Sequence, residues 1–102
     1  MSSPGGGPPP KVVTIGVDAQ GNPTCDPMEV AIWSTLGDTV NWVSSGIVFL
    51  ITFPVTSPFS QSNFYGPNVC TGPIRAGVSG LFKYEVHVNG NILDPKVGVH
   101  PP

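Results

Sequence analysis

The fold is decided most clearly by the stretch FKYEVHVNGNILDPKVGV, residues 82–99. Apolar and aromatic residues alternate with polar ones over 82–88, which is the two-residue period of a half-buried strand. The Asn-Gly-Asn turn at 89–91 then sends the chain back into a second apolar run over 92–99. Because Pro95 cannot donate to a strand ladder, this returning strand is expected at a sheet edge or with a bulge.

Earlier segments show the same period and add further short strands. No convincing helical period of 3.6 is visible over any long window, whereas strands are predicted at 11–17, 28–33, 39–43 and 47–53. Residues 54–74 contain four prolines and two glycines, so this segment is predicted to be a long loop. The pattern as a whole predicts an all-β fold, a Greek-key sandwich of two sheets with six to eight strands.

Length and charge limit the domain count and the class of partner. The 102 residues are enough for one domain, with residues 1–10 as a flexible Pro/Gly-rich leader and residues 11–100 as the β-sandwich domain. Four basic and six acidic residues give a net charge of −2, which argues against nucleic-acid and membrane-surface binding. No apolar run approaches the roughly 20 residues of a membrane span, and the first ten residues show no signal-peptide pattern.

Two motifs resemble those of the cupredoxins. Gly37-Asp38-Thr39-Val40-Asn41-Trp42 is similar to the turn that launches a core strand in that family, and Gly80-Leu81-Phe82-Lys83-Tyr84 is similar to its penultimate strand. The resemblance covers roughly residues 11–100 and implies the cupredoxin-like sandwich. With Tyr84-Glu85-Val86-His87-Val88 followed by Leu93-Asp94-Pro95, the chain more closely resembles short bacterial cupredoxin-like proteins without copper, which have no assigned activity.

The copper ligands of the family have no counterparts here. A blue-copper site needs a cysteine, two histidines and a weak axial thioether. By the resemblance the cysteine would fall at Val86, the second histidine near Asn89 and the methionine near Leu93. The first histidine would follow the strand with Trp42, but residues 43–69 contain no histidine. We therefore expect no copper, no other metal site and no cofactor.

The chain has two cysteines, and their state is left open between two main alternatives. A disulfide between Cys25 and Cys70 would close a loop of about 46 residues and contribute roughly 4 kcal/mol in the chain-entropy model. Reduced, structural thiols are the alternative. We predict the disulfide, which would indicate an extracytoplasmic location, whereas unpaired cysteines would favour the cytoplasm.

Catalytic patterns are missing, and the chain is predicted not to be an enzyme. The carboxylates are scattered singly, no Gly-x-Ser-x-Gly elbow is present, and His87 shares a strand face with Lys83 and Glu85, as a solvated or ion-paired imidazole would.

The most unusual feature is a segment of 36 residues between Asp38 and Arg75 without a charge. Soluble monomers normally intersperse charges on their surface, so an uncharged segment suggests a contact surface, with Phe59, Phe64 and Tyr65 as its aromatic part. The leading hypothesis is a non-catalytic module that self-assembles into a homo-oligomer or fibre. The alternative is a glycan- or peptide-binding domain that uses the aromatic 54–74 loop, with a ligand that the sequence does not identify.

Overall fold

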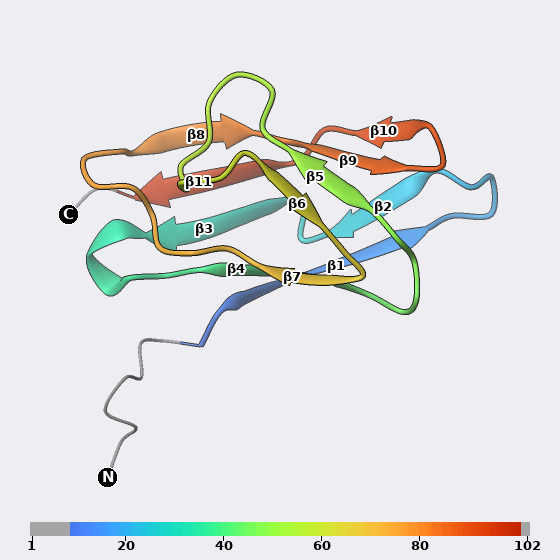
Figure 1. Ribbon diagram of the computed structural model, residues 1–102, viewed down its shortest axis with the longest axis horizontal. Helices are drawn as coiled ribbons and strands as arrows, with labels where there is room; N and C mark the ends of the chain where they lie inside the picture. The colour runs from blue at the N-terminus through green and yellow to red at the C-terminus, as the bar shows by residue number, and fades with distance from the viewer. Residues whose placement is uncertain (1–8, 101–102) are drawn as a thin grey trace, which may run out of the picture.

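The structure, a computed structural model, describes residues 9–100. Short strands joined by turns and loops follow one another along most of this part (Figure 1). The predicted leader, residues 1–10, lies mostly outside that part. The only helical element described is a short 3-10 helix, η1 (Ser34–Leu36), so the all-β prediction is confirmed. The strands are β1 (Lys11–Val17), β2 (Pro23–Asp26), β3 (Glu29–Trp33), β4 (Val40–Ser44), β5 (Leu50–Thr52), β6 (Asn63–Tyr65), β7 (Asn68–Cys70), β8 (Gly80–Lys83), β9 (Glu85–Val88), β10 (Asn91–Leu93) and β11 (Lys96–His100).

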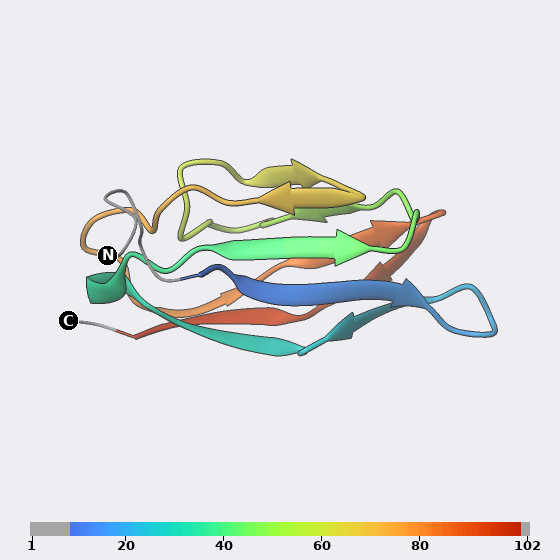
Figure 2. The same cartoon turned by 90° about the horizontal axis from the view of Figure 1, so that it is seen from below.

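The strands form three sheets. Sheet A has the order β2-β1-β4-β7, sheet B has the order β3-β11-β8, and sheet C has the order β10-β9-β5-β6. Two pairings are parallel, β1 with β4 and β11 with β3, and the others are antiparallel. Figure 2 shows β7, β4 and β1 of sheet A side by side.

Sheets B and C share the C-terminal hairpin. Only Tyr84 separates β8 from β9, and only Asp94 and Pro95 separate β10 from β11, so each arm of the hairpin passes from one sheet into the other (Figure 1). The Tyr84 N–H donates to the Pro95 carbonyl at 3.0 Å and continues the ladder across the break. The returning strand was expected at a sheet edge or with a bulge; it instead breaks at Asp94 and Pro95, with β10 at an edge of sheet C and β11 in the middle of sheet B.

One core of buried side chains lies between the sheets, an arrangement compatible with a β-sandwich. Sheet A contributes its alternate residues, among them Val40 and Trp42, both of which are fully buried. The hairpin contributes Phe82, Tyr84 and Val86 from one face, as the alternation over 82–88 predicts. All these residues belong to a single buried cluster.

The strand count was predicted too low. Eleven strands are found in residues 9–100 where six to eight were expected. The predicted long strands of the hairpin are each split in two, and β2 was not expected. The predicted 54–74 loop contains β6 and β7, because strands of three residues are too short to display a period of two.

Candidate interaction surface

The predicted aromatic surface is mostly buried. Phe59 and Phe64 are only 2% and 3% exposed, and their ring centroids lie 6.2 Å apart in the core. Phe64 occupies the inward position of β6, and a β-bridge with Ile74 ties Phe59 to the sandwich. The expectation that both are exposed is wrong. Tyr65, the next residue of β6, faces outward and is 68% exposed, as the strand alternation requires.

The two cysteines are unpaired, and the sheet order explains why. Cys25 lies in β2 and Cys70 in β7, at opposite edges of sheet A. Three strand spacings of about 4.8 Å separate these edges by roughly 14 Å. A disulfide needs α-carbons within about 7 Å, so the predicted disulfide is wrong. The predicted compartment, which depended on that pairing, stays a prediction.

Cys25 instead belongs to a buried chain of hydrogen bonds. The Trp42 Nε1–H donates to the Tyr84 hydroxyl at 3.2 Å, and that hydroxyl lies 3.4 Å from the Cys25 Sγ. The Cys25 thiol in turn donates to the Pro27 carbonyl at 3.4 Å. Burial raises the pKa of both Cys25 and Tyr84, so each keeps its proton near neutral pH. The arrangement is structural, because it holds sheet A to the point where β8 becomes β9.

A histidine and a glutamate form a pair on the outer face of sheet C. His87 Nε2 lies 2.9 Å from Glu85 Oε1, and both side chains are 30% exposed. His100 lies elsewhere, at the end of β11. Within residues 9–100, no three His, Cys, Asp or Glu side chains lie close enough to hold a metal ion. The His87–Glu85 pair therefore has the geometry of a surface ion pair.

The outer face of sheet B carries apolar and aromatic side chains. Across its three strands, Ala31 of β3, Gly98 of β11 and Leu81 of β8 are directly opposite one another. Two residues further along, Trp33 stacks on His100 with ring centroids 4.4 Å apart and planes 12° from parallel. Leu81 is 57% exposed and Trp33 is 37% exposed. We call these five residues the sheet B surface.

Neither the backbone conformation nor the packing at position 98, in the middle of this surface, requires a glycine. Its φ is not in the left-handed region, and an added Cβ would meet only Glu29 Oε2 at 3.8 Å, Leu81 Cδ1 at 3.9 Å and the Val30 carbonyl at 4.0 Å. These are ordinary contacts. A glycine inside a strand weakens it and often marks a place where another molecule approaches closely.

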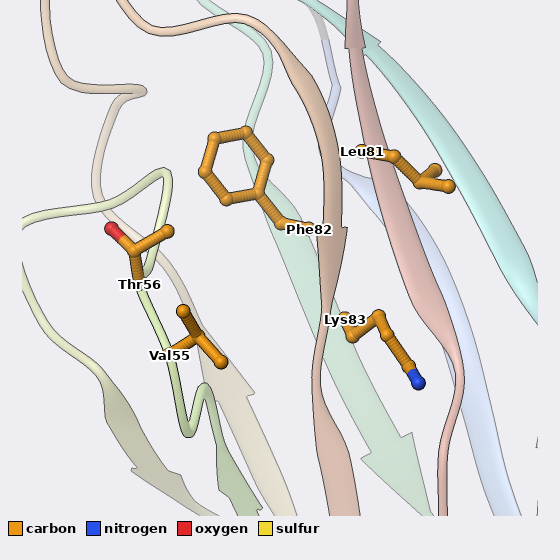
Figure 3. A pocket seen from close by; sticks show the side chains of 5 residues that line it. All are labelled: Val55, Thr56, Leu81, Phe82 and Lys83. Carbon is orange, nitrogen blue, oxygen red and sulfur yellow. The ribbon is translucent and has the colours of Figure 1, made fainter.

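A cleft of about 210 Å³ opens beside β8, next to the sheet B surface (Figure 3). Val55, Thr56, Leu81, Phe82 and Lys83 line it. In Figure 3, Phe82 points from β8 toward the segment with Val55 and Thr56, whereas Leu81 and Lys83 point to the other side of the strand. Val55 is 91% exposed, the largest exposed fraction among the large apolar residues described.

The cleft exists because the chain after β5 does not follow β8. β5 pairs with β9, with Thr52 opposite Glu85, and Phe53 continues the pairing with β6 on the other edge by donating to Ser62 at 2.8 Å. Pro54 then has no N–H to donate. The segment bends away from β8, and among residues 9–100 no strand pairs with the outer edge of β8.

Arg75 holds the outer wall of the cleft in place. Its backbone N–H donates to the Pro58 carbonyl at 2.7 Å, and its Nε donates to the Ser57 carbonyl at 3.0 Å. The Ser57 hydroxyl caps the same turn by donating to Gln61 and accepting from the Phe59 N–H. The wall is therefore fixed by charge-assisted bonds, and the cleft is a built feature of the fold.

Comparison with known proteins assigns no relative: neither the protein families nor the curated proteins give a match to this chain. Among the residues that the structure describes, no helix is both long and apolar enough to cross a bilayer.

Sequence reasoning missed the sheet B surface and the cleft. The alternation of Glu29, Ala31 and Trp33 with buried residues could have shown that these three share a face. Their position in one sheet with β11 and β8 depends on strand pairing between distant segments, which no local pattern encodes.

Proposed function

We propose that this chain is a non-catalytic, cupredoxin-like module without copper that acts through contacts between copies, as the structural subunit of an oligomer or fibre. The observation that carries the proposal is the group of exposed apolar side chains at β8 and on the outer face of sheet B: Leu81 and Trp33 on that face, and Val55 in the cleft beside β8. Single exposed apolar residues are ordinary, but adjoining ones that form a patch mark sites of association.

The composition of this surface fits contact with another protein better than chemistry. The residues at its centre, Ala31 and Gly98, have a small side chain or none, and larger apolar or aromatic side chains lie at its ends. A flat partner can therefore approach the backbone closely at the centre. The cupredoxin-like part of the proposal is supported by the buried Val40 and Trp42 of sheet A, in the motif that carries the resemblance.

The alternative, a glycan or peptide bound by the aromatic 54–74 loop, loses most of its aromatic platform. Phe59 and Phe64 support the core, and only Tyr65 of the three is available to stack on a ligand. Contacts between copies are therefore the better supported proposal.

The proposal is tested by measuring the average mass by sedimentation or light scattering from about 1 μM to about 1 mM. We expect the mass to rise well above the 10.6 kDa of one chain. Leu81→Lys should reduce the rise, whereas the control Ile92→Lys, at a similarly exposed position in sheet C, should not. A mass that stays at 10.6 kDa over the whole range would overturn the proposal.

A further inference from the structure

We propose that copies of this chain join head to tail by antiparallel pairing of β3 from one copy with β8 of the next. In this pairing Glu29 lies opposite Lys83, Val30 opposite Phe82 and Ala31 opposite Leu81. The inference rests on the proposed function and gives it a specific interface, which makes sheet B continuous from copy to copy.

The first argument is the direction of the free hydrogen-bonding groups of β8. Antiparallel ladders alternate between residues that bond to the neighbor and residues that point away from it. The Tyr84 N–H donates to Pro95, so the backbone N–H and C=O groups of every second residue before it also point toward β11. These residues are Phe82 and Gly80, which lie opposite Val97 and Val99. The N–H and C=O groups of Leu81 and Lys83 therefore point to the free edge, toward the cleft.

The same reasoning applies to β3 at the other edge of sheet B. The Lys96 N–H donates to the Met28 carbonyl at 2.9 Å, which fixes the phase of the parallel pairing between β11 and β3. Val30 and Ile32 then face β11, while the backbone groups of Glu29 and Ala31 point away. At the end of the strand, the Trp33 N–H is already bonded to Asp38 Oδ2 at 2.9 Å.

These two free edges match in register. Antiparallel pairing of Glu29 with Lys83 places Ala31 opposite Leu81, and both are then pairs whose free N–H and C=O groups face each other. The side chains match on both faces of the sheet. Val30 and Phe82 lie on the core side, and the other two pairs lie on the outer side.

The charges favour this partner. Lys83 lies directly opposite Lys96 within its own sheet, and directly opposed like charges destabilise a ladder. Glu29 of the next copy would stand on the open side of Lys83 and offset the repulsion. The row Glu29–Lys96–Lys83 would then repeat from copy to copy, with an acid beside each pair of lysines.

The cleft provides room for the incoming strand. Val30 of the next copy would lie over Phe82 and beside Val55, so the most exposed of the large apolar residues would be covered. Because the two edges differ, the contact is heterologous, and repetition produces a ring or a filament.

The test uses charge reversal with compensation, followed by sedimentation. Glu29→Lys and Lys83→Glu should each weaken association about ten-fold or more, because every contact then opposes like charges. An equimolar mixture of the two variants should assemble, since each contact between unlike variants pairs opposite charges. The double variant should also assemble alone. Circular dichroism verifies that each variant is folded.

A second pair of variants tests the backbone bonds. Leu81→Pro removes an N–H that faces the free edge and no bond within the subunit, so it should abolish association in folded protein. Leu81→Ala keeps the N–H and should assemble more strongly than Leu81→Pro.

The outcomes separate this inference from the proposed function. A wild type that stays monomeric overturns both. A wild type that assembles while the charge reversals leave its association constant unchanged, or a mixture that assembles no better than either variant, overturns only the β3–β8 interface.

Discussion

β8 and β9 together form the first arm of the C-terminal hairpin. They share one alternation of buried and exposed residues but have different neighbouring strands. β9 has β10 on one side and β5 on the other, so its backbone is bonded along both edges. β8 has β11 on one side and a cleft on the other. The difference arises outside the hairpin, where the chain leaves β5 at Phe53 and Pro54. A strand can therefore be an inner strand or an edge strand for reasons that its own sequence does not contain.

The largest expected effect on stability comes from placing a proline in β9 and comparing it with a proline in β8. His87→Pro removes an N–H that faces Leu50 of β5 and should cost at least about 2 kcal/mol of unfolding free energy. Leu81→Pro, six residues earlier and in the same phase, should cost far less in the dilute monomer. Urea denaturation measures both, with His87→Ala and Leu81→Ala as side-chain controls. Equal losses for the two prolines would contradict the assignment of β8 as an open edge.

The next largest effect on stability is expected at Tyr84, which joins β8 to β9. Tyr84→Phe removes the hydroxyl that accepts the Trp42 Nε1–H and leaves that donor buried without a partner, at a cost of about 1–3 kcal/mol. Tyr65→Phe, on the exposed side of β6, should change stability by less than about 0.5 kcal/mol. Thermal or urea unfolding compares the two. If both variants are as stable as the wild type, the buried bond contributes nothing.

The pH dependence of stability tests the same junction. Burial raises the pKa of Cys25 from its ordinary 9.0 and that of Tyr84 from its ordinary 10.0. The unfolded chain therefore loses these protons first, and stability should fall as pH rises above about 9, by up to about 1.4 kcal/mol per pH unit for each group. Unfolding curves at pH 8–11 should show this slope, and Cys25→Ala should delay its onset. A flat profile would contradict the burial of both groups.

The smallest effect is expected at Gly98. Gly98→Ala meets only ordinary contacts and should stabilise the dilute monomer by about 0.5 kcal/mol, because alanine loses less conformational freedom on folding. Gly66→Ala is the matched control, since its Cβ would collide with the Phe49 ring and should destabilise the fold. A loss of stability in Gly98→Ala would mean that the glycine is required by the subunit itself.

The sequence predicted those elements whose pattern is long. The strand over residues 11–17 has the predicted bounds, and the buried sides of the hairpin and of the Val40–Trp42 strand follow from the alternation. The same rule applied to Asn63-Phe64-Tyr65 would have placed Phe64 in the core, but three residues between Ser60-Gln61-Ser62 and Gly66-Pro67 have the sequence pattern of a loop.

What could not be predicted depends on contacts between distant segments. The separation of Cys25 from Cys70 follows from the strand order of sheet A, and the open edge of β8 follows from the path of residues 53–62. Neither is written in a local period. The candidate surface therefore became visible only with the register of sheet B.

The most direct test of the account is amide hydrogen exchange, measured residue by residue in dilute and in concentrated protein. Head-to-tail assembly predicts that the amides of Glu29, Ala31, Leu81 and Lys83 exchange rapidly when dilute and become protected together when concentrated. Protection that appears elsewhere, or unchanged rapid exchange at these four amides in assembled protein, would contradict the pairing of β3 with β8.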